Sequence, residues 1–354
     1  MKRKISLILF VVMLFSGCTV QNEEKESIKE ETGVSAVWIF YNELNMINEG
    51  GGNESLFRDK VSKMFDDCVS WGINTVFLQV RPCADSFYNS SIFPWSYYLT
   101  GEQGKAVNYD PLKISIEEAH KRKLTLHAWI NPFRIAFSDD ISKLSDNHPA
   151  MKWIQKKKAD VVFVNGGIYF SPASLEAQKL VIDGVREIIR NYDVDGILYD
   201  DYFYPSKTID LEEYEKSGTT LTIEEYRTNN ISNLIKKTYE TIKSIKKEVK
   251  FSISPAGNIN NNLNNEYLDI EFILKNNNYL NYVIPQIYFG FDNETLPFIK
   301  TVKMWNDLIL NNDTKLVVAL SLYKSGNTDK YAGSGKNEWI ENSDIITNQI
   351  VESR

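Results

Sequence analysis

The sequence predicts an α/β protein whose parallel strands and covering helices form a (β/α)8 barrel of the TIM type. From Val34 onward, short apolar runs rich in Val, Ile and aromatic residues alternate with longer amphipathic stretches, which is the rhythm of a parallel sheet covered by helices. No Gly-rich dinucleotide fingerprint follows the first run, which disfavours an open nucleotide-binding sheet. Polar residues gather just after several runs, where parallel barrels carry their functional residues.

Seven segments have the composition of buried strands. They are residues 34–41, 74–82, 124–133, 194–204, 249–255, 282–289 and 316–323. No eighth strand follows the helix-like segment that opens at Ser343, and a barrel without it leaves unpaired backbone groups on two edges. We therefore expect the eighth strand to be missing from this chain, with residues 34–354 a C-terminally truncated barrel. The alternatives are that the amphipathic tail or a partner chain covers the gap.

Helix boundaries are marked by capping residues. Apolar side chains recur at helical spacing from Leu56 to Val69, and Gly72 stands where a helix terminator is expected. Two Xaa-Pro pairs predict an N-cap with Pro at the first helical position, and one segment has the pattern of a capping box. These starts are Asp110-Pro111, Ser171-Pro172 and Thr222-Ile223-Glu224-Glu225.

The first 18 residues have the features of an export signal. Three basic residues, 2–4, precede an apolar run, 5–15, that is too short to span a bilayer but suits a signal peptide. Small residues then stand directly before Cys18, as in a lipoprotein signal whose thiol is acylated. We expect the protein to be exported and lipid-anchored to the outer face of the cell membrane through Cys18. The alternatives are a plain cleaved signal peptide and an uncleaved anchor. Residues 19–33 are expected to be a flexible tether.

Composition excludes several classes of protein. The net charge is -7 and the Lys and Arg residues form no basic block, so nucleic acid is not expected as a partner. Three His residues at unsuitable spacing predict no metal centre, no G-x-S-x-G elbow is present, and no cofactor is expected. Nineteen Tyr and seven Trp suit either stacking on sugar rings or a large aromatic core.

Polar residues follow five of the predicted strands. The strand ends are Gln79-Val80-Arg81-Pro82, His127-Ala128-Trp129-Ile130-Asn131-Pro132, Asp200-Asp201-Tyr202-Phe203-Tyr204-Pro205, Ser252-Ile253-Ser254-Pro255 and Pro285-Gln286-Ile287-Tyr288. The carboxyl ends of barrel strands meet at one face. These five ends therefore predict one site.

The same segments resemble the bacterial glycosyl hydrolase-like family 10. The resemblance is carried by these strand ends and by Asp85-Ser86-Phe87-Tyr88, Pro94-Trp95-Ser96, Leu99-Thr100-Gly101, Tyr109-Asp110-Pro111-Leu112, Glu118-Ala119-His120, Phe133-Arg134 and Asp195-Gly196-Ile197. It covers nearly everything from Val34 to the end and implies a TIM-barrel envelope protein related to glycosidases, with an oligo- or polysaccharide substrate. Asn281 stands where the family tends to have Asp.

Glycoside hydrolysis normally uses two converging carboxyl groups. Asp200 and Asp201 point to opposite faces of a strand, since successive side chains alternate. The segment Asp195-Gly196-Ile197 looks like the fourth-strand motif of several glycosidase clans, and that likeness gives Asp200 the inward parity. We expect Asp200 to be the catalytic carboxylate and Asp201 to be its partner in a supporting role or a cap on the next turn. The alternative is that the two acids bind a helix N-terminus or a cation.

The second catalytic carboxyl group is predicted to be Asp85, in the segment after the second strand. Asp292 and Glu294 rank next, and Glu102 and Asp110 are further rivals, although Asp110 is better explained as a helix cap.

Other polar and aromatic residues of the strand ends are expected to bind the sugar. The hydrogen-bonding set is Arg81, His127, Asn131, Arg134, Tyr202, Gln286 and Tyr288, with Trp95 and Trp129 as stacking platforms. The expected function is a glycoside hydrolase that cleaves an envelope or extracellular glycan, with peptidoglycan strands as the first candidate, by carboxylate acid/base chemistry. The alternative is a non-catalytic carbohydrate-binding lipoprotein on the same barrel.

Overall fold

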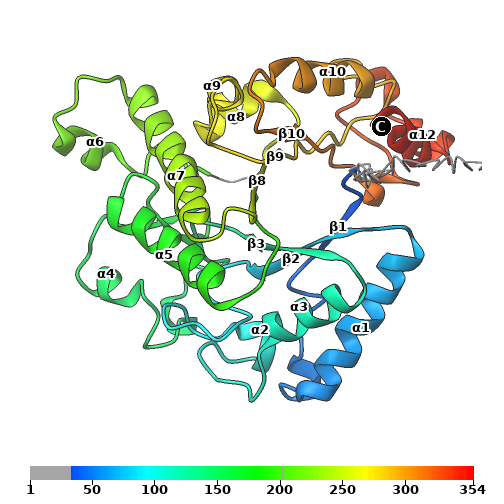
Figure 1. The fold of residues 1–354 in the computed structure, drawn as a ribbon. Coiled ribbons are helices and arrows are strands. Elements are labelled where there is room, and N and C mark those ends of the chain that lie inside the picture. Colours follow the sequence, from blue (N-terminus) through cyan, green and yellow to red (C-terminus); the bar gives the residue numbers. More distant parts are fainter. Residues whose placement is uncertain (1–32, 201–202) are drawn as a thin grey trace, which may run out of the picture. The chain divides into compact units, whose positions relative to one another are not determined.

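Seven parallel strands form the central sheet of this protein, as the computed structural model shows for residues 33–200 and 203–354 (Figure 1). The chain divides into two units, Met1–Gly33 and Val34–Arg354, and the fold described below is that of the second. The predicted signal peptide, Cys18 and most of the tether lie outside the described residues, as do Asp201 and Tyr202.

The sheet confirms the predicted fold class. Its strand order is β1-β2-β3-β7-β8-β9-β10, and all pairings are parallel. The strands are β1 (Ala36–Ile39), β2 (Thr75–Arg81), β3 (Thr125–Ile130), β7 (Gly196–Asp200), β8 (Lys250–Ser254), β9 (Tyr282–Val283) and β10 (Lys315–Leu316). Each lies within or at the edge of a predicted segment, and no eighth strand joins this sheet within the described residues.

The last two strands are much shorter than predicted. Pro285 follows β9 and has no N–H to donate, so the regular ladder stops there. Pairing continues only through isolated bridges, in which Gln286 lies between Ala256 and Ala319. The chain stays extended past the proline, and Gln286 still takes its place beside β8.

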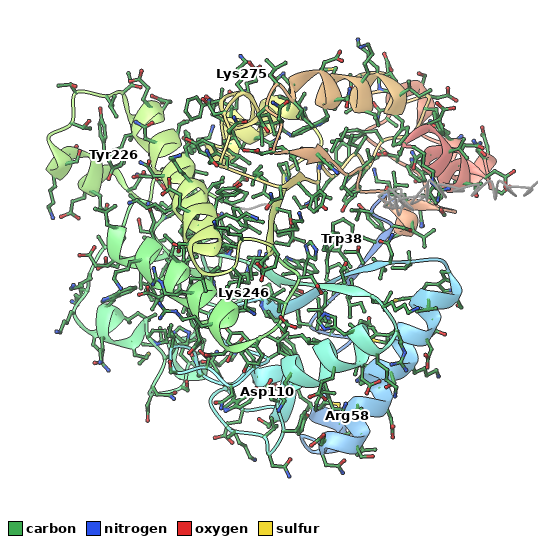
Figure 2. All side chains as sticks on the ribbon, in the orientation of Figure 1. Trp38, Arg58, Asp110, Tyr226, Lys246 and Lys275 are labelled. Carbon is green, nitrogen blue, oxygen red and sulfur yellow. The ribbon has the colours of Figure 1, made fainter. Side chains whose placement is uncertain are left out.

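Alternation along the strands separates two apolar cores. Side chains of one parity, including Phe77, Trp129, Leu198, Ile284 and Ala319, pack together on the inner face of the curved sheet. The opposite parity packs against the surrounding helices in the larger core. Trp38 of β1, labelled in Figure 2, is partly buried and packs against the inner cluster. The inner positions of a parallel barrel are filled by such layers.

Helices cover the outer face of the sheet (Figure 1). The longer ones are α1 (Glu54–Ser70), α3 (Pro111–Lys121), α5 (Leu175–Asn191), α7 (Ile223–Ile245), α8 (Ile259–Glu266), α10 (Phe298–Leu308) and α12 (Ile345–Glu352). The shorter ones are α2 (Tyr97–Thr100), α4 (Met151–Gln155), α6 (Leu211–Ser217), α9 (Ile270–Lys275) and α11 (Glu338–Glu341). None of the helices in the described part has both the length and the apolar character needed to cross a bilayer.

Two of the three predicted helix starts are confirmed. Asp110 caps α3 by accepting the Lys113 N–H at 3.1 Å, and the Thr222 capping box of α7 is formed in both directions. The start at Ser171-Pro172 is wrong, because Ser174 caps α5 by accepting the Ala177 N–H at 3.0 Å. The helix expected to open near Ser343 is α12, and its Gln349 donates a hydrogen bond of 2.8 Å to the Phe289 carbonyl.

A small antiparallel sheet after β3 was not predicted. It consists of β4 (Arg134–Ala136), β5 (Val161–Val164) and β6 (Gly167–Phe170), in the order β4-β6-β5. Asn165 and Gly166 join β5 to β6 with φ values of +52° and +74°, which is the left-handed geometry that an Asn-Gly hairpin turn requires. That dipeptide between two apolar runs was the signal available in the sequence.

Candidate functional site

Polar side chains converge at the carboxyl ends of the inner face, a group that we call the barrel mouth: Gln79, Asn131, Asp200, Ser254 and Gln286. The Gln286 Nε2 donates to Asp200 Oδ1 at 3.1 Å and to the Ser254 carbonyl at 3.3 Å. The Gln79 Nε2 donates to Asn131 Oδ1 at 2.6 Å. Residues from five strands thus meet at the mouth, in one hydrogen-bonded pair of amides and one group of three that contains the carboxylate.

Asp200 is the last residue of β7 and lies on its inner face. Gly196 and Leu198 share its parity, and Leu198 belongs to the inner core. The register of β3 with β7 ends at Ile130 opposite Tyr199, so the next residues along the two chains, Asn131 and Asp200, are neighbours. Asp200 is partly exposed. The carboxylate that sequence parity selected therefore lies at the barrel mouth.

Buried polar contacts hold the loop that follows Asp200. Asp210 is fully buried and accepts hydrogen bonds from the Arg227 Nε and Nη2, the latter at 2.7 Å. Asp210 also accepts from the Tyr204 hydroxyl, while Arg227 Nη1 donates to the Tyr267 hydroxyl at 2.7 Å. This cluster fixes the return of the loop onto α7 and the chain after α8.

Sequence reasoning missed Glu266, which holds the same loop from the α8 side. Its Oε2 accepts the Tyr204 N–H at 2.9 Å, and burial raises the pKa of its carboxyl above the usual value. A carboxyl group at the carboxyl-terminal side of β8 was visible in the sequence. Its role as a backbone acceptor depends on where α8 packs, which no local pattern reveals.

Arg81 lies away from the mouth, although it was predicted to bind sugar. A β-bulge places Val80 and Arg81 opposite the single residue Ile130, so the alternation reverses after Gln79. The Arg81 side chain is 1% exposed, and its guanidinium carbon lies 4.5 Å from the centre of the Phe93 ring. A Cβ on Gly184 of α5 would lie 2.2 Å from Arg81 Nη1. This glycine explains how the guanidinium fits beneath the helix.

His127 and Trp129 face inward and are buried. His127 pairs in register with Gly196, four residues before Asp200, which corresponds to roughly 13 Å along a strand. Burial lowers the pKa of His127 to about 4, so the ring is neutral at physiological pH. Trp129 is 2% exposed. Both side chains are buried inside the barrel, His127 deep below Asp200 and Trp129 at the level of Gln79, with which it pairs in register.

The remaining predicted residues lie around the mouth or further out. Tyr288 is partly exposed and its ring lies 6.0 Å from that of Tyr323. The Arg134 guanidinium carbon lies 4.8 Å from the centre of the Phe137 ring, and Trp95 is half-buried against the outer core. The rival acids Glu102, Asp292 and Glu294 are exposed in loops, and Asp110 serves as the α3 cap.

Asp85 is buried in the segment after β2 and does not line the mouth. It is 2% exposed, and its Oδ2 accepts the Tyr97 N–H and the Gln103 Nε2 at 3.3 Å each. Burial raises the pKa of the carboxyl to about 6. Direct contact with a substrate would require α2 to move, so this placement favours an anchoring role over the predicted role of second carboxyl group.

Asp85→Asn is expected to leave activity nearly unchanged and to raise stability at neutral pH. The folded protein holds the Asp85 proton up to about pH 6, whereas the unfolded chain loses it near 3.9. Between these values the folded state binds more protons, so this group's contribution to stability falls as the pH rises and then levels off above about 6. Asn removes that loss, which is on the order of 1–3 kcal/mol.

The measurement is urea unfolding of wild type and Asp85→Asn from pH 4 to pH 7, with the exposed Asp139→Asn as the matched control. The difference between wild type and Asp85→Asn should grow over this interval, and the control should show none. Loss of turnover in Asp85→Asn with unchanged melting would contradict the anchoring role and restore the catalytic one.

Two further features of the described residues bear on the site. No group of three or more His, Cys, Asp or Glu side chains within residues 33–200 and 203–354 is arranged to hold a metal ion. A surface depression of about 600 Å³ lies between α5 and α7, lined by both acidic and basic side chains. It lies on the helical side of the barrel, so it is separate from the mouth.

These features define a TIM-type barrel protein with a carboxylate-centred polar site at the carboxyl ends of its strands. The chain belongs to the glycosyl hydrolase-like 10 family, whose model matches residues 33–334. It is 32% identical to the protein named glycosyl hydrolase YngK of Bacillus subtilis (strain 168), covering 98% of this chain and 72% of that one. It is also 32% identical to glycosyl hydrolase DigH of Escherichia coli (strain K12), over 77% and 67% of the two chains.

A solved structure supports the fold assignment. The glycoside hydrolase domain of PgaB (BpsB) from Bordetella bronchiseptica aligns with a TM-score of 0.54 at 9% sequence identity, covering 80% of this chain and 84% of that domain. At this identity the likeness concerns the fold alone. The family assignment rests on the sequence match.

Proposed function

We propose that this protein hydrolyses glycosidic bonds of an envelope or extracellular glycan, with peptidoglycan strands as the first candidate substrate. Membership of the glycosyl hydrolase-like 10 family and the names of its relatives support glycosidase-type chemistry. The observation that carries the proposal is Asp200, a partly exposed carboxylate at the barrel mouth that accepts an amide hydrogen bond from Gln286 at 3.1 Å.

One amide donor orients the Asp200 carboxyl group. The hydrogen bond from Gln286 Nε2 to Oδ1 holds this group at the mouth, and we assign it the role of nucleophile or base. Gln286 is itself oriented by the Ser254 carbonyl. Asn131 and Gln79 supply amide groups beside the carboxylate, and such groups suit hydrogen bonding to sugar hydroxyls.

The second carboxyl group is best sought outside the buried Asp85. Asp201 directly follows Asp200 but lies outside the described residues. The burial of Asp85 also favours the second candidate function, a carbohydrate-binding protein that uses the same mouth without turnover.

Release of new reducing ends separates these two functions. The protein is incubated with peptidoglycan glycan strands freed of peptides, and reducing ends are counted over time. Hydrolysis supports the proposal. Binding of the strands without new reducing ends supports the carbohydrate-binding protein. If the strands are neither bound nor cleaved, peptidoglycan is excluded as the substrate.

The substrate assignment follows from the proposed location. We propose that Cys18 is acylated and anchors the protein at the outer face of the cell membrane, which holds the barrel beside envelope glycans. Cells that express the protein and are fed a fatty-acid analogue should label the wild type, and Cys18→Ala should lose the label. Cys68→Ala is the control, because Cys68 is a buried thiol of α1 and should not affect labelling. Absence of label on the wild type would exclude acylation of Cys18 and with it the lipid anchor.

A further inference from the structure

Aromatic side chains from three successive loops cluster at one side of the mouth. We call Phe40, Tyr41, Tyr97, Tyr98 and Phe137 the aromatic rim. Phe40 and Tyr41 follow β1, Tyr97 and Tyr98 lie in α2 after β2, and Phe137 follows β4. All five therefore lie on the side of the sheet where the strands end. The Tyr41 ring centre lies 4.3 Å from that of Tyr98 and 5.9 Å from that of Phe137. Sequence reasoning did not select any of them.

The rim is attached to the mouth by direct contacts. The Tyr41 N–H donates to Gln79 Oε1 at 3.3 Å, and Gln79 is the partner of Asn131, the neighbour of Asp200. Phe40, the preceding residue, lies with its ring centre 5.1 Å from that of Trp129, edge to face. The rim and the carboxylate are therefore joined through a short chain of contacting residues.

Three rings of the rim are about half exposed. Phe40 is 52% exposed, Phe137 is 51% exposed and Tyr97 is 47% exposed. Contacts of Tyr41 and Tyr98 link Tyr97 and Phe137 into one patch, and contiguous exposed apolar patches mark binding sites where single exposed rings do not. The two tryptophans expected to stack on sugar are, in contrast, covered: Trp129 is 2% exposed and Trp95 is half-buried.

The chemistry of the rim selects a carbohydrate chain as its occupant. Aromatic rings offer flat apolar faces that suit the C–H faces of pyranose rings, and the tyrosine hydroxyls add polar groups at the edges of these faces. Arg134 lies over the Phe137 ring at 4.8 Å and adds a polar group at the rim's edge.

We propose that the aromatic rim is an extended binding subsite in which sugar units beyond the scissile bond stack on Phe40, Tyr97 and Phe137. The inference rests on the proposed function, because it assumes that the mouth binds a glycan. It predicts that the protein binds long glycan chains more tightly than disaccharides. Cleavage by such an enzyme would depend on chain length because each further ring contact adds binding energy.

The test measures how binding depends on chain length in the Asp200→Asn protein, where slow turnover permits titration calorimetry. The probes are N-acetylglucosamine oligomers from dimer to hexamer and peptide-free peptidoglycan strands. Phe137→Ala and Tyr97→Ala should each weaken binding of the longest probe by roughly tenfold and leave the dimer within twofold. Phe137→Tyr should retain affinity, whereas Phe137→Leu, which keeps apolar bulk without a ring, should not.

Trp71→Ala is the matched control. Trp71 is an exposed aromatic residue, 69% exposed, that precedes β2 at the opposite end of the strands, so its loss should change no affinity. The subsite proposal is overturned if all rim variants bind the long probes with unchanged affinity. It is also overturned if Phe137→Ala loses binding of a protein partner while its binding of glycan stays intact. If the subsite alone is wrong, wild type still cleaves the strands. If neither binding nor cleavage of any probe occurs, both proposals fail.

Discussion

Replacing Asp200 by Asn is expected to lower kcat by roughly 10³- to 10⁵-fold on the cleaved glycan, with little change in melting. Asn keeps the volume of the side chain and can still accept the Gln286 Nε2 hydrogen bond that Asp200 Oδ1 accepts at 3.1 Å. It removes the charge that a nucleophile or base requires. KM should change far less than kcat, because the sugar contacts come from other residues.

Asp193→Asn is the matched control for this variant. Asp193 precedes β7 at its amino end, its side chain is 84% exposed, and its contact with Lys246 at 3.4 Å is a surface ion pair of little energetic consequence. From the sequence pattern alone, Asp201→Asn is expected to cost less than Asp200→Asn, because successive residues alternate between the two faces of a strand. Equal activity of Asp200→Asn and wild type would refute the assignment of Asp200.

Replacing Arg227 by Met is expected to destabilise the protein by about 3–5 kcal/mol. The side chains of Arg227 and Asp210 are 4% and 0% exposed, and removing the guanidinium leaves a buried carboxylate without its counter-ion. The Lys207 carbonyl, which accepts from Arg227 Nη2 at 2.6 Å, loses its donor as well. Urea unfolding monitored by fluorescence measures the loss, and turnover should fall too, because this cluster holds the loop that follows Asp200.

A double replacement separates the buried charge from the packing. Asp210→Leu combined with Arg227→Met removes both charges and should be less destabilising than Arg227→Met alone, because no isolated charge remains buried. The exposed pair of Lys303 and Asp307 on α10 provides the control, and Lys303→Met should change stability by less than about 1 kcal/mol. A loss below about 1 kcal/mol for Arg227→Met would show that the cluster is not an energetic anchor.

Alternation of side chains was sufficient to place Asp200, because β7 is a regular strand that keeps its parity from Gly196 to its end. The strand count was predictable for a similar reason, since each buried run is bounded by capping residues and helical spacing. The same rule failed for Arg81. A bulge is set by how β2 meets β3, and nothing in the β2 sequence alone signals the extra residue.

The loops beyond the strands were less predictable. The position of Asp85 after a strand end predicts a catalytic group, but in the fold this residue is buried beside α2, with Tyr97 and Gln103 as hydrogen-bond donors. No local sequence pattern predicts the aromatic rim, because Tyr41, Tyr98 and Phe137 are far apart in the sequence and meet only through packing. Composition indicated abundant aromatic residues but could not distinguish core rings from exposed ones.

The bulge in β2 also bears on the charge preference of the mouth. With the bulge, Gln79 presents a neutral amide to the mouth, and the guanidinium of Arg81 is buried beneath α5. Regular pairing of the same sequence without the bulge would place Arg81 opposite Asn131, turn the guanidinium inward and leave α5 without its buried cation. The irregular register of one strand therefore keeps a cation out of the mouth, to which β2 and β3 contribute the neutral amides of Gln79 and Asn131.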